Sequence, residues 1–370
     1  YYSLVLLALL GAFYLINVND LALLLSAWAL IAVSGYVIAG LKKDADSVEG
    51  AAKYSLMGTA ASALMLLGIA TVFSLSNTTS VHEMFGMFIA PKNLLILLAG
   101  ILLFTAAFGF KIGVVPFHGW LPDVYGGIHP ILVTYLAGVI KVGSIIAMLR
   151  VLYPLAISLG TRWLPLFAIL SIATMTFGNV VALVQRNVQR MMAYSSIAHI
   201  GYVMVGMASL TTAGYLEGMK GIALMVFSYV FAKVGVFTAL SYLSRKGLEL
   251  TLDGIRGIGK KMPLISALIV VLMIDLIGIP PLLGFWSKFY LFVSVAEAAP
   301  WLTLIALINS GISVGYYAQV IRYLLFMPSS ETELKESLSD PEMVVTVICV
   351  LALIIAGLGP AIALAPYLRF

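Results

Sequence analysis

Two stretches decide the fold of this chain: ILLFTAAFGFKIGVVPFHGW at residues 101–120 and IDLIGIPPLLGFWSKF at residues 274–289. Both are apolar runs of the kind that cross a membrane as a helix, yet each is interrupted by Gly and Pro and carries one lysine, Lys111 or Lys288. Proline removes a backbone hydrogen bond and clashes with the preceding turn, so a helix breaks there. Irregular backbone at membrane depth is tolerated only where it is buried in protein or lines a wet cavity. The two stretches therefore predict a pair of broken transmembrane helices, a pattern typical of transporter sites.

The rest of the chain is equally apolar. Of its 370 residues, 62% are hydrophobic and 10% are charged, and the mean hydropathy is +1.08, whereas a soluble domain averages about 25% charged residues. The apolar runs are continuous over roughly 20 residues, without the alternation of membrane strands. We expect an all-α polytopic membrane protein with eleven spans, at residues 1–17, 20–40, 53–75, 93–116, 129–152, 163–184, 191–209, 219–243, 264–298, 302–326 and 343–366.

The spans predict one transmembrane domain with a defined orientation, because no loop is long enough to fold separately. Residues 1–152 and 163–326 hold five spans each and would be inverted repeats, since an odd number of spans reverses the second copy; residues 343–366 form a last helix. Of the 21 Lys and Arg residues, twelve fall on the side of the chain start and five on the other. By the positive-inside rule, the chain starts on the cytoplasmic (or matrix) side and ends on the opposite side.

Four lysines fall inside predicted spans: Lys111, Lys141, Lys233 and Lys288. A charged side chain at the bilayer centre costs about 2.5–3.5 kcal/mol on insertion scales, so such residues are functional candidates by default. A buried lysine can also gain and lose a proton near neutral pH. The row predicts a proton path. The structural alternatives are lysines that satisfy carbonyls at the helix breaks and, for Lys233, a side chain that snorkels to an interface.

Other titratable residues give weaker candidates, each with a structural alternative. Asp275 is either a counter-charge for Lys288 or Lys233 or a protonated, hydrogen-bonded acid. His199 is a relay member or a core histidine bonded to a carbonyl. His118 and Asp123 would mark a proton entry on the side of the chain start, or would fix a loop.

Several classes of site are excluded by the composition. The single cysteine, Cys349, rules out an internal disulfide and thiolate-ligated clusters. The histidines are too scattered for a metal site, and no GxGxxG, P-loop or CxxC motif is present. The net charge of +5 follows from loop asymmetry, so no nucleic-acid partner is expected. The chain opens directly into an apolar helix, without the basic segment of a cleavable signal peptide.

Five segments carry a resemblance to a known family. They are DSVEGAAKYSLMGTAASALMLLGIA (46–70), AFGFKIGVVPFHGWLPDVYGG (107–127), GVIKVG (138–143), VALVQRNVQRMMAYSSIAHIGYVMVG (181–206) and GIPPLLGFWSKFYLF (278–292). Together they resemble the antiporter-like membrane subunits of complex I, NADH:quinone oxidoreductase, in the branch of subunit N, or mitochondrial subunit 2. The same family includes subunits of multisubunit Na⁺/H⁺ antiporters.

The resemblance implies a fold with two inverted five-helix repeats, here without the family's first three helices. It implies that Lys111, Lys141 and Lys288 handle protons. The family's glutamate partner of the first lysine would fall at Ala29, so that carboxylate is missing, and Lys233 stands where subunit N commonly has a neutral residue.

The resemblance also implies a prokaryotic cell membrane (or mitochondrial inner membrane) protein that binds no redox cofactor itself. Flavin, iron–sulfur clusters and quinone would belong to partner subunits, and the other partners would be further membrane-arm subunits and the lipid bilayer. The expected function is proton translocation through a lysine relay, driven by electron transfer elsewhere in the complex. The alternatives are a Na⁺/H⁺ antiporter subunit and a scaffold subunit that does not pump.

Overall fold

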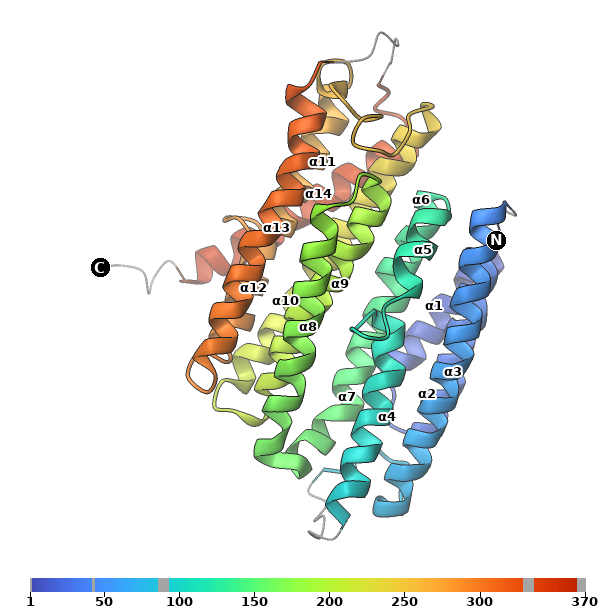
Figure 1. Cartoon of the computed structure of the whole chain (residues 1–370), viewed down its shortest axis with the longest axis vertical. Helices are drawn as coiled ribbons and strands as arrows, with labels where there is room; N and C mark the ends of the chain where they lie inside the picture. The colour runs from blue at the N-terminus through green and yellow to red at the C-terminus, as the bar shows by residue number, and fades with distance from the viewer. Residues whose placement is uncertain (1, 42–43, 86–92, 329–335, 365–370) are drawn as a thin grey trace.

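The computed structural model describes residues 2–41, 44–85, 93–328 and 336–364, and this part of the chain is a bundle of helices (Figure 1). Their bounds are α1 Tyr2–Ile16, α2 Leu21–Ala39, α3 Ala45–Ser76, α4 Leu94–Ile112, α5 Trp120–Gly127, α6 Pro130–Tyr135, η2 Leu136–Ile140, α7 Lys141–Leu159, η3 Gly160–Arg162, α8 Trp163–Leu183, α9 Val188–Ala208, η4 Ser209–Thr211, α10 Tyr215–Arg245, η5 Ile258–Lys260, α11 Pro263–Ile277, α12 Leu283–Val293, α13 Pro300–Phe326 and α14 Pro341–Leu364.

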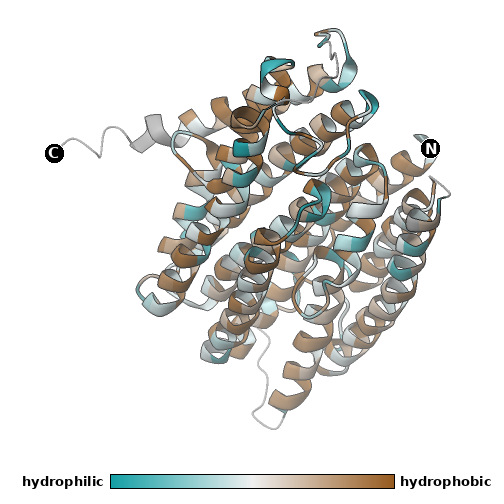
Figure 2. Cartoon of the chain, turned by 45° about the horizontal axis from the view of Figure 1, so that its top comes forward, coloured by the Kyte–Doolittle hydropathy of each residue, from teal (hydrophilic) through white to brown (hydrophobic). Residues whose placement is uncertain are grey.

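The predicted spans all have counterparts among these helices, and the fold class is confirmed. The fifth span is the continuous run of α6, η2 and α7, and the ninth is the pair α11 and α12. Eight described stretches are long and apolar enough to cross a membrane. Figure 2 shows hydrophobic residues along the helices and hydrophilic ones gathered mostly in the connections. The largest difference is in α3, which begins at Ala45 rather than at residue 53, because Asp44 caps it by accepting a hydrogen bond from the backbone N of Ser47.

The packing joins the two halves through α9 and α10. In the first half α4 packs on α3 and α7, and α1 packs on α2 and α7. In the second half α9 is almost wholly buried, against α8, α10 and α12. Helix α10 also contacts α6 and η2, and α5 contacts α9. Residues of both halves therefore meet around α9 and α10. The repeat boundaries at 152 and 163 stay a prediction.

Short bridges tie the connections together at each end of the bundle. At one end Asp20 pairs with Ser80, and at the other Asn187 pairs with Thr251. Each pair fixes two loops that are distant in the sequence, which holds the ends of four helices in register.

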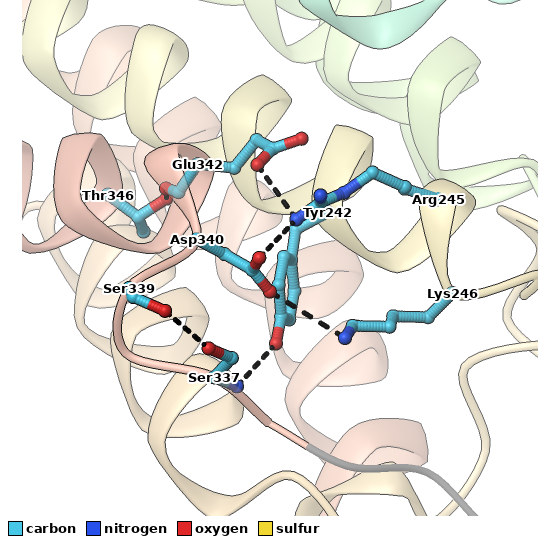
Figure 3. A network of polar contacts seen from close by, with 8 residues as sticks. All are labelled: Tyr242, Arg245, Lys246, Ser337, Ser339, Asp340, Glu342 and Thr346. Atoms are coloured by element: carbon cyan, nitrogen blue, oxygen red, sulfur yellow. Dashed lines mark hydrogen bonds and ion pairs between the residues drawn. The ribbon is translucent and has the colours of Figure 1, made fainter.

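A polar cluster fastens the start of α14 to the end of α10 (Figure 3). Arg245 forms ion pairs with Asp340 at 3.1 Å and with Glu342 at 3.0 Å. The backbone N of Ser337 donates to the hydroxyl of Tyr242 at 3.1 Å. This acidic segment therefore binds within the chain, and its negative charges face a helix end that carries basic residues.

Candidate functional site

The first helix break lies at the end of α4. Gly113 adopts the left-handed conformation (φ 89°), which a residue with a Cβ rarely does, and both Gly113 and Val114 donate their backbone N–H to the carbonyl of Gly109. The indole of Trp120, at the start of α5, donates to the carbonyl of Phe110 at 2.8 Å. The break places Lys111 in the last turn of α4, where a cation is favoured by the helix dipole.

The second break lies between α11 and α12, and a side chain of each helix forms hydrogen bonds with the backbone of the other. Gly278, again left-handed (φ 87°), ends α11. Lys288 of α12 reaches back and donates from Nζ to the carbonyls of Leu276 and Ile277, at 3.1 and 2.7 Å. Asp275 of α11 accepts a hydrogen bond from the backbone N of Gly284 in α12 at 2.9 Å. The charged side chains thus satisfy backbone groups that the break leaves free.

Asp275 was predicted to be a counter-charge or a protonated, hydrogen-bonded acid, and the choice between these two roles stays a prediction. It is fully buried and also accepts a hydrogen bond from the Ser228 hydroxyl at 2.7 Å. No ion pair joins it to Lys288 or Lys233 among the ion pairs of the described residues.

Lys111 and Lys141 are each only 1% exposed, and within the described residues neither side-chain nitrogen has a hydrogen-bond partner. The Nζ of Lys141 lies 5.7 Å from the ring centroids of both Tyr125 and Tyr229. Lys141 follows directly on the π-helical turn η2, a feature frequent at functional sites. Lys111 is surrounded by aromatic rings in the same way.

Ala29 does not face this site. Its side chain is exposed on the outer surface of α2, while the neighbouring Trp28 is buried against Lys111. The missing carboxylate is therefore not replaced by another one beside Lys111 in the described part of the chain, where Lys111 forms no ion pair.

Lys233 and His199 meet at one turn of α9. Lys233 donates to the hydroxyl of Ser195 at 2.6 Å and to the carbonyl of Met192 at 3.0 Å. His199 Nδ1 lies 2.8 Å from the carbonyl oxygen of Ser195. Lys233 is completely buried, so it does not snorkel to an interface. The ring of Tyr229 lies within 6.0 Å of Lys233 as well as beside Lys141.

A line of buried aromatic rings connects these side chains, and the sequence reasoning missed it. Neighbouring members lie between 4.2 and 6.5 Å apart, measured between ring centroids or from a lysine Nζ to a centroid. In order they are Lys111, Tyr54, Trp120, Tyr125, Lys141, Tyr229, His199, Tyr202 and Lys288. One signal was available: Tyr229 precedes Lys233 by four residues and Tyr202 follows His199 by three, spacings that share a helix face.

The two predicted entry residues lie apart from this line. Asp123, at the start of α5, forms an ion pair with Lys53 at 2.7 Å and is exposed. The His118 ring packs edge-on against Phe177, with centroids 4.4 Å apart. No hydrogen bond joins His118 to Asp123 among those of the described residues, so a common entry site stays a prediction.

The arrangement can hold and pass protons, since it offers four buried amines and an imidazole with hydroxyl and carbonyl neighbours. Among the described residues there is no group of three His, Cys, Asp or Glu that could hold a metal ion. The expectation of no cofactor in this chain stays a prediction.

Comparison with known proteins places these features in a family. The family described as "NADH:quinone oxidoreductase/Mrp antiporter, TM" matches residues 18–313. The F(420)H(2) dehydrogenase subunit N of Methanosarcina mazei is 37% identical over 97% of this chain and 74% of that protein. The NADH-quinone oxidoreductase subunit N of Trichlorobacter lovleyi is 34% identical over 98% of this chain and 75% of that protein.

Solved structures show the same fold. A chain of the respiratory complex I of Thermus thermophilus is 28% identical, with a TM-score of 0.82 over 98% of this chain and 79% of that one. A chain of the Mrp complex of Dietzia sp. is 20% identical, with a TM-score of 0.86 over 98% of this chain and 76% of that one. At that identity, the second likeness concerns the fold alone.

Proposed function

Because the chain belongs to the NADH:quinone oxidoreductase/Mrp antiporter transmembrane family, we propose that it is the proton-translocating membrane-arm subunit of a complex-I-like oxidoreductase. Protons enter from the side of the chain start, the cytoplasm or matrix. They pass along Lys111, Lys141, Lys233 and Lys288, and leave on the opposite side. Electron transfer in partner subunits, which hold the flavin, iron–sulfur clusters and quinone, drives the cycle.

The observation that carries this proposal is the row of buried lysines with its aromatic lining. All four lysines are at most 4% exposed, and buried rings pack beside them in the interval between the two broken helices. Four enclosed lysine side chains are an expensive arrangement for a scaffold. Lys111 and Lys141 bond no group in the described part of the chain, so a scaffold would keep its fold equally well with apolar residues at those two positions.

Electrostatics gives a plausible coupling strength. A unit charge that approaches a lysine to about 5 Å, at an effective dielectric constant near 20, changes its energy by roughly 3 kcal/mol. That free energy changes the ratio of charged to neutral lysine by about a hundredfold. Proton movement onto one lysine can therefore unload the next.

Sodium transport is the alternative, and the contacts of Asp275 make it less favourable. Sodium would need oxygen ligands near the middle of the membrane. Asp275 is a buried carboxylate near the second break, and each of its oxygens already accepts a hydrogen bond.

The proposal is tested with membrane vesicles that carry the intact parent complex, in which redox-driven proton uptake and electron transfer are followed together. Lys111→Met should lower both severalfold at an unchanged level of assembly. Lys220→Met is the matched control, because Lys220 is exposed and its contacts lie outside the row of buried lysines: a long 3.8 Å ion pair with Glu217 and a 5.9 Å contact with the ring of Tyr290. If Lys111→Met leaves both rates at the wild-type level, the lysine path is not used and the scaffold alternative holds. Uptake that requires added sodium would favour the antiporter alternative.

A further inference from the structure

The ammonium of Lys111 lies inside a box of three aromatic rings. Its Nζ is 5.1 Å from the ring centroid of Trp28, 5.5 Å from that of Tyr36 and 5.6 Å from that of Tyr54. These rings come from α2 and α3, while Lys111 ends α4. Among the described residues it has no hydrogen-bond partner and no ion pair, and it is 1% exposed.

Such a box stabilises a cation without a negative charge. The face of an aromatic ring is negative, and a cation within about 6 Å of the centroid is attracted, most strongly by Trp and when water is excluded. Lys233 and Lys288 each have hydrogen-bond acceptors and only one ring. Among the four buried lysines, Lys111 has the most rings and lacks acceptors.

The rings are held in place by contacts of their own. The indole of Trp28 donates to the hydroxyl of Ser62 at 3.0 Å. Tyr54 stacks on Trp120, with centroids 4.2 Å apart and planes at 15°. Tyr36 meets Tyr54 edge-on at 4.8 Å. Two of the three rings are thus held by contacts other than Lys111, so a charge on the lysine requires little additional ordering of side chains.

We propose that Trp28, Tyr36 and Tyr54 are positioning residues that hold the charged state of Lys111 in place of a carboxylate. This inference rests on the proposed role of Lys111 as a proton carrier. A lysine paired with a carboxylate must separate from a full opposite charge when it passes its proton on. In the aromatic box the loaded state is stabilised, yet the departing proton leaves no buried anion behind.

The test compares loss of a ring with loss of packing, in vesicles that carry the parent complex. Trp28→Leu should lower redox-driven proton uptake about five- to tenfold, because the best of the three rings is removed. Trp28→Phe keeps a ring over Lys111 and should stay within about twofold of wild type. The matched control is Trp163→Leu, since Trp163 is also a buried indole with one hydrogen bond, to the carbonyl of Met207, in the other half of the chain.

Each outcome decides the proposal. It is wrong if Trp28→Leu and Trp28→Phe lose uptake equally, or if Trp163→Leu loses as much as Trp28→Leu at normal assembly. If Trp28→Leu does not assemble, the pair Tyr36→Leu and Tyr36→Phe makes the same comparison, because Tyr36 is only partly buried. Lys111→Met in the same vesicles separates the two claims. Full uptake in that variant refutes the proposed function, whereas lost uptake with an unaffected Trp28→Leu refutes the box alone.

Discussion

The carboxylate at the second break allows a sharp prediction, because two substitutions at one position separate its possible roles. Asp275 accepts one hydrogen bond from the backbone N of Gly284 and one from the hydroxyl of Ser228. These contacts clamp α11 to α12 and α10. If clamping is its role, an amide at this position should serve nearly as well as a carboxylate.

The magnitudes follow from the two hydrogen bonds. Asp275→Ala leaves the N–H of Gly284 and the hydroxyl of Ser228 buried without an acceptor, at about 1–3 kcal/mol each, which lowers the free energy of unfolding by roughly 2–6 kcal/mol. Asp275→Asn keeps an oxygen for Gly284, and the hydroxyl of Ser228 can turn to accept from the amide. Its expected cost is about 1 kcal/mol.

The assay measures the thermal inactivation midpoint of the solubilised parent complex, the amount assembled in membranes, and redox-driven proton uptake. We expect Asp275→Ala to lower the midpoint and the assembled amount, and Asp275→Asn to retain at least half of wild-type uptake. Normal assembly of Asp275→Asn with uptake abolished would refute the clamp and assign Asp275 as a counter-charge.

Two further predictions concern α9 and the start of α14. Ser195→Ala removes the hydroxyl that accepts from Lys233, so proton uptake should fall severalfold. Ser209→Ala removes another buried hydroxyl, which donates to the carbonyl of Gly206, and should leave uptake unchanged. Equal effects would contradict a role for the contact between Ser195 and Lys233. Burial raises the pKa of Asp340, but the hydrogen bond from Arg245 and nearby positive charges outweigh it and lower the pKa below its usual value. The ion pair therefore stabilises the fold above about pH 4, and this stabilisation is lost as the pH falls further. The difference in thermal midpoint between wild type and Asp340→Asn should be constant from about pH 5 to 7 and should disappear in stronger acid. A difference that persists in strong acid would show that the charge of Asp340 is not its cause.

The helical spans and both breaks could be predicted from the sequence because they depend on local chemistry. Apolar length sets a span, and the Gly and Pro residues clustered in two of the apolar runs mark the breaks, where Gly113 and Gly278 end α4 and α11. The burial of the four lysines could be predicted from the same runs, since a residue in the middle of an apolar span has little access to water.

The partners of those lysines could not be predicted, because they depend on how helices pack. The resemblance to the family points to Ala29 as the place of a lost carboxylate, but in the structure that side chain is exposed and Trp28 lies over Lys111. In the same way Asp275 binds Gly284 and Ser228 rather than a lysine in an ion pair. These contacts depend on how α2 is rotated about its axis and on how α12 packs against α11. Neither can be read from the local pattern of apolar residues in the sequence.

The most direct test of a continuous path is the rate of redox-driven proton uptake, with electron transfer followed in parallel, in vesicles carrying the parent complex with Lys141→Met. Lys141 lies beside both Tyr125 and Tyr229, where the line of rings passes from the first half to the second. With assembly confirmed and Lys220→Met as control, we expect proton uptake to fall at least fivefold. A proton-to-electron ratio equal to that of wild type, with both rates unchanged, would contradict a continuous path.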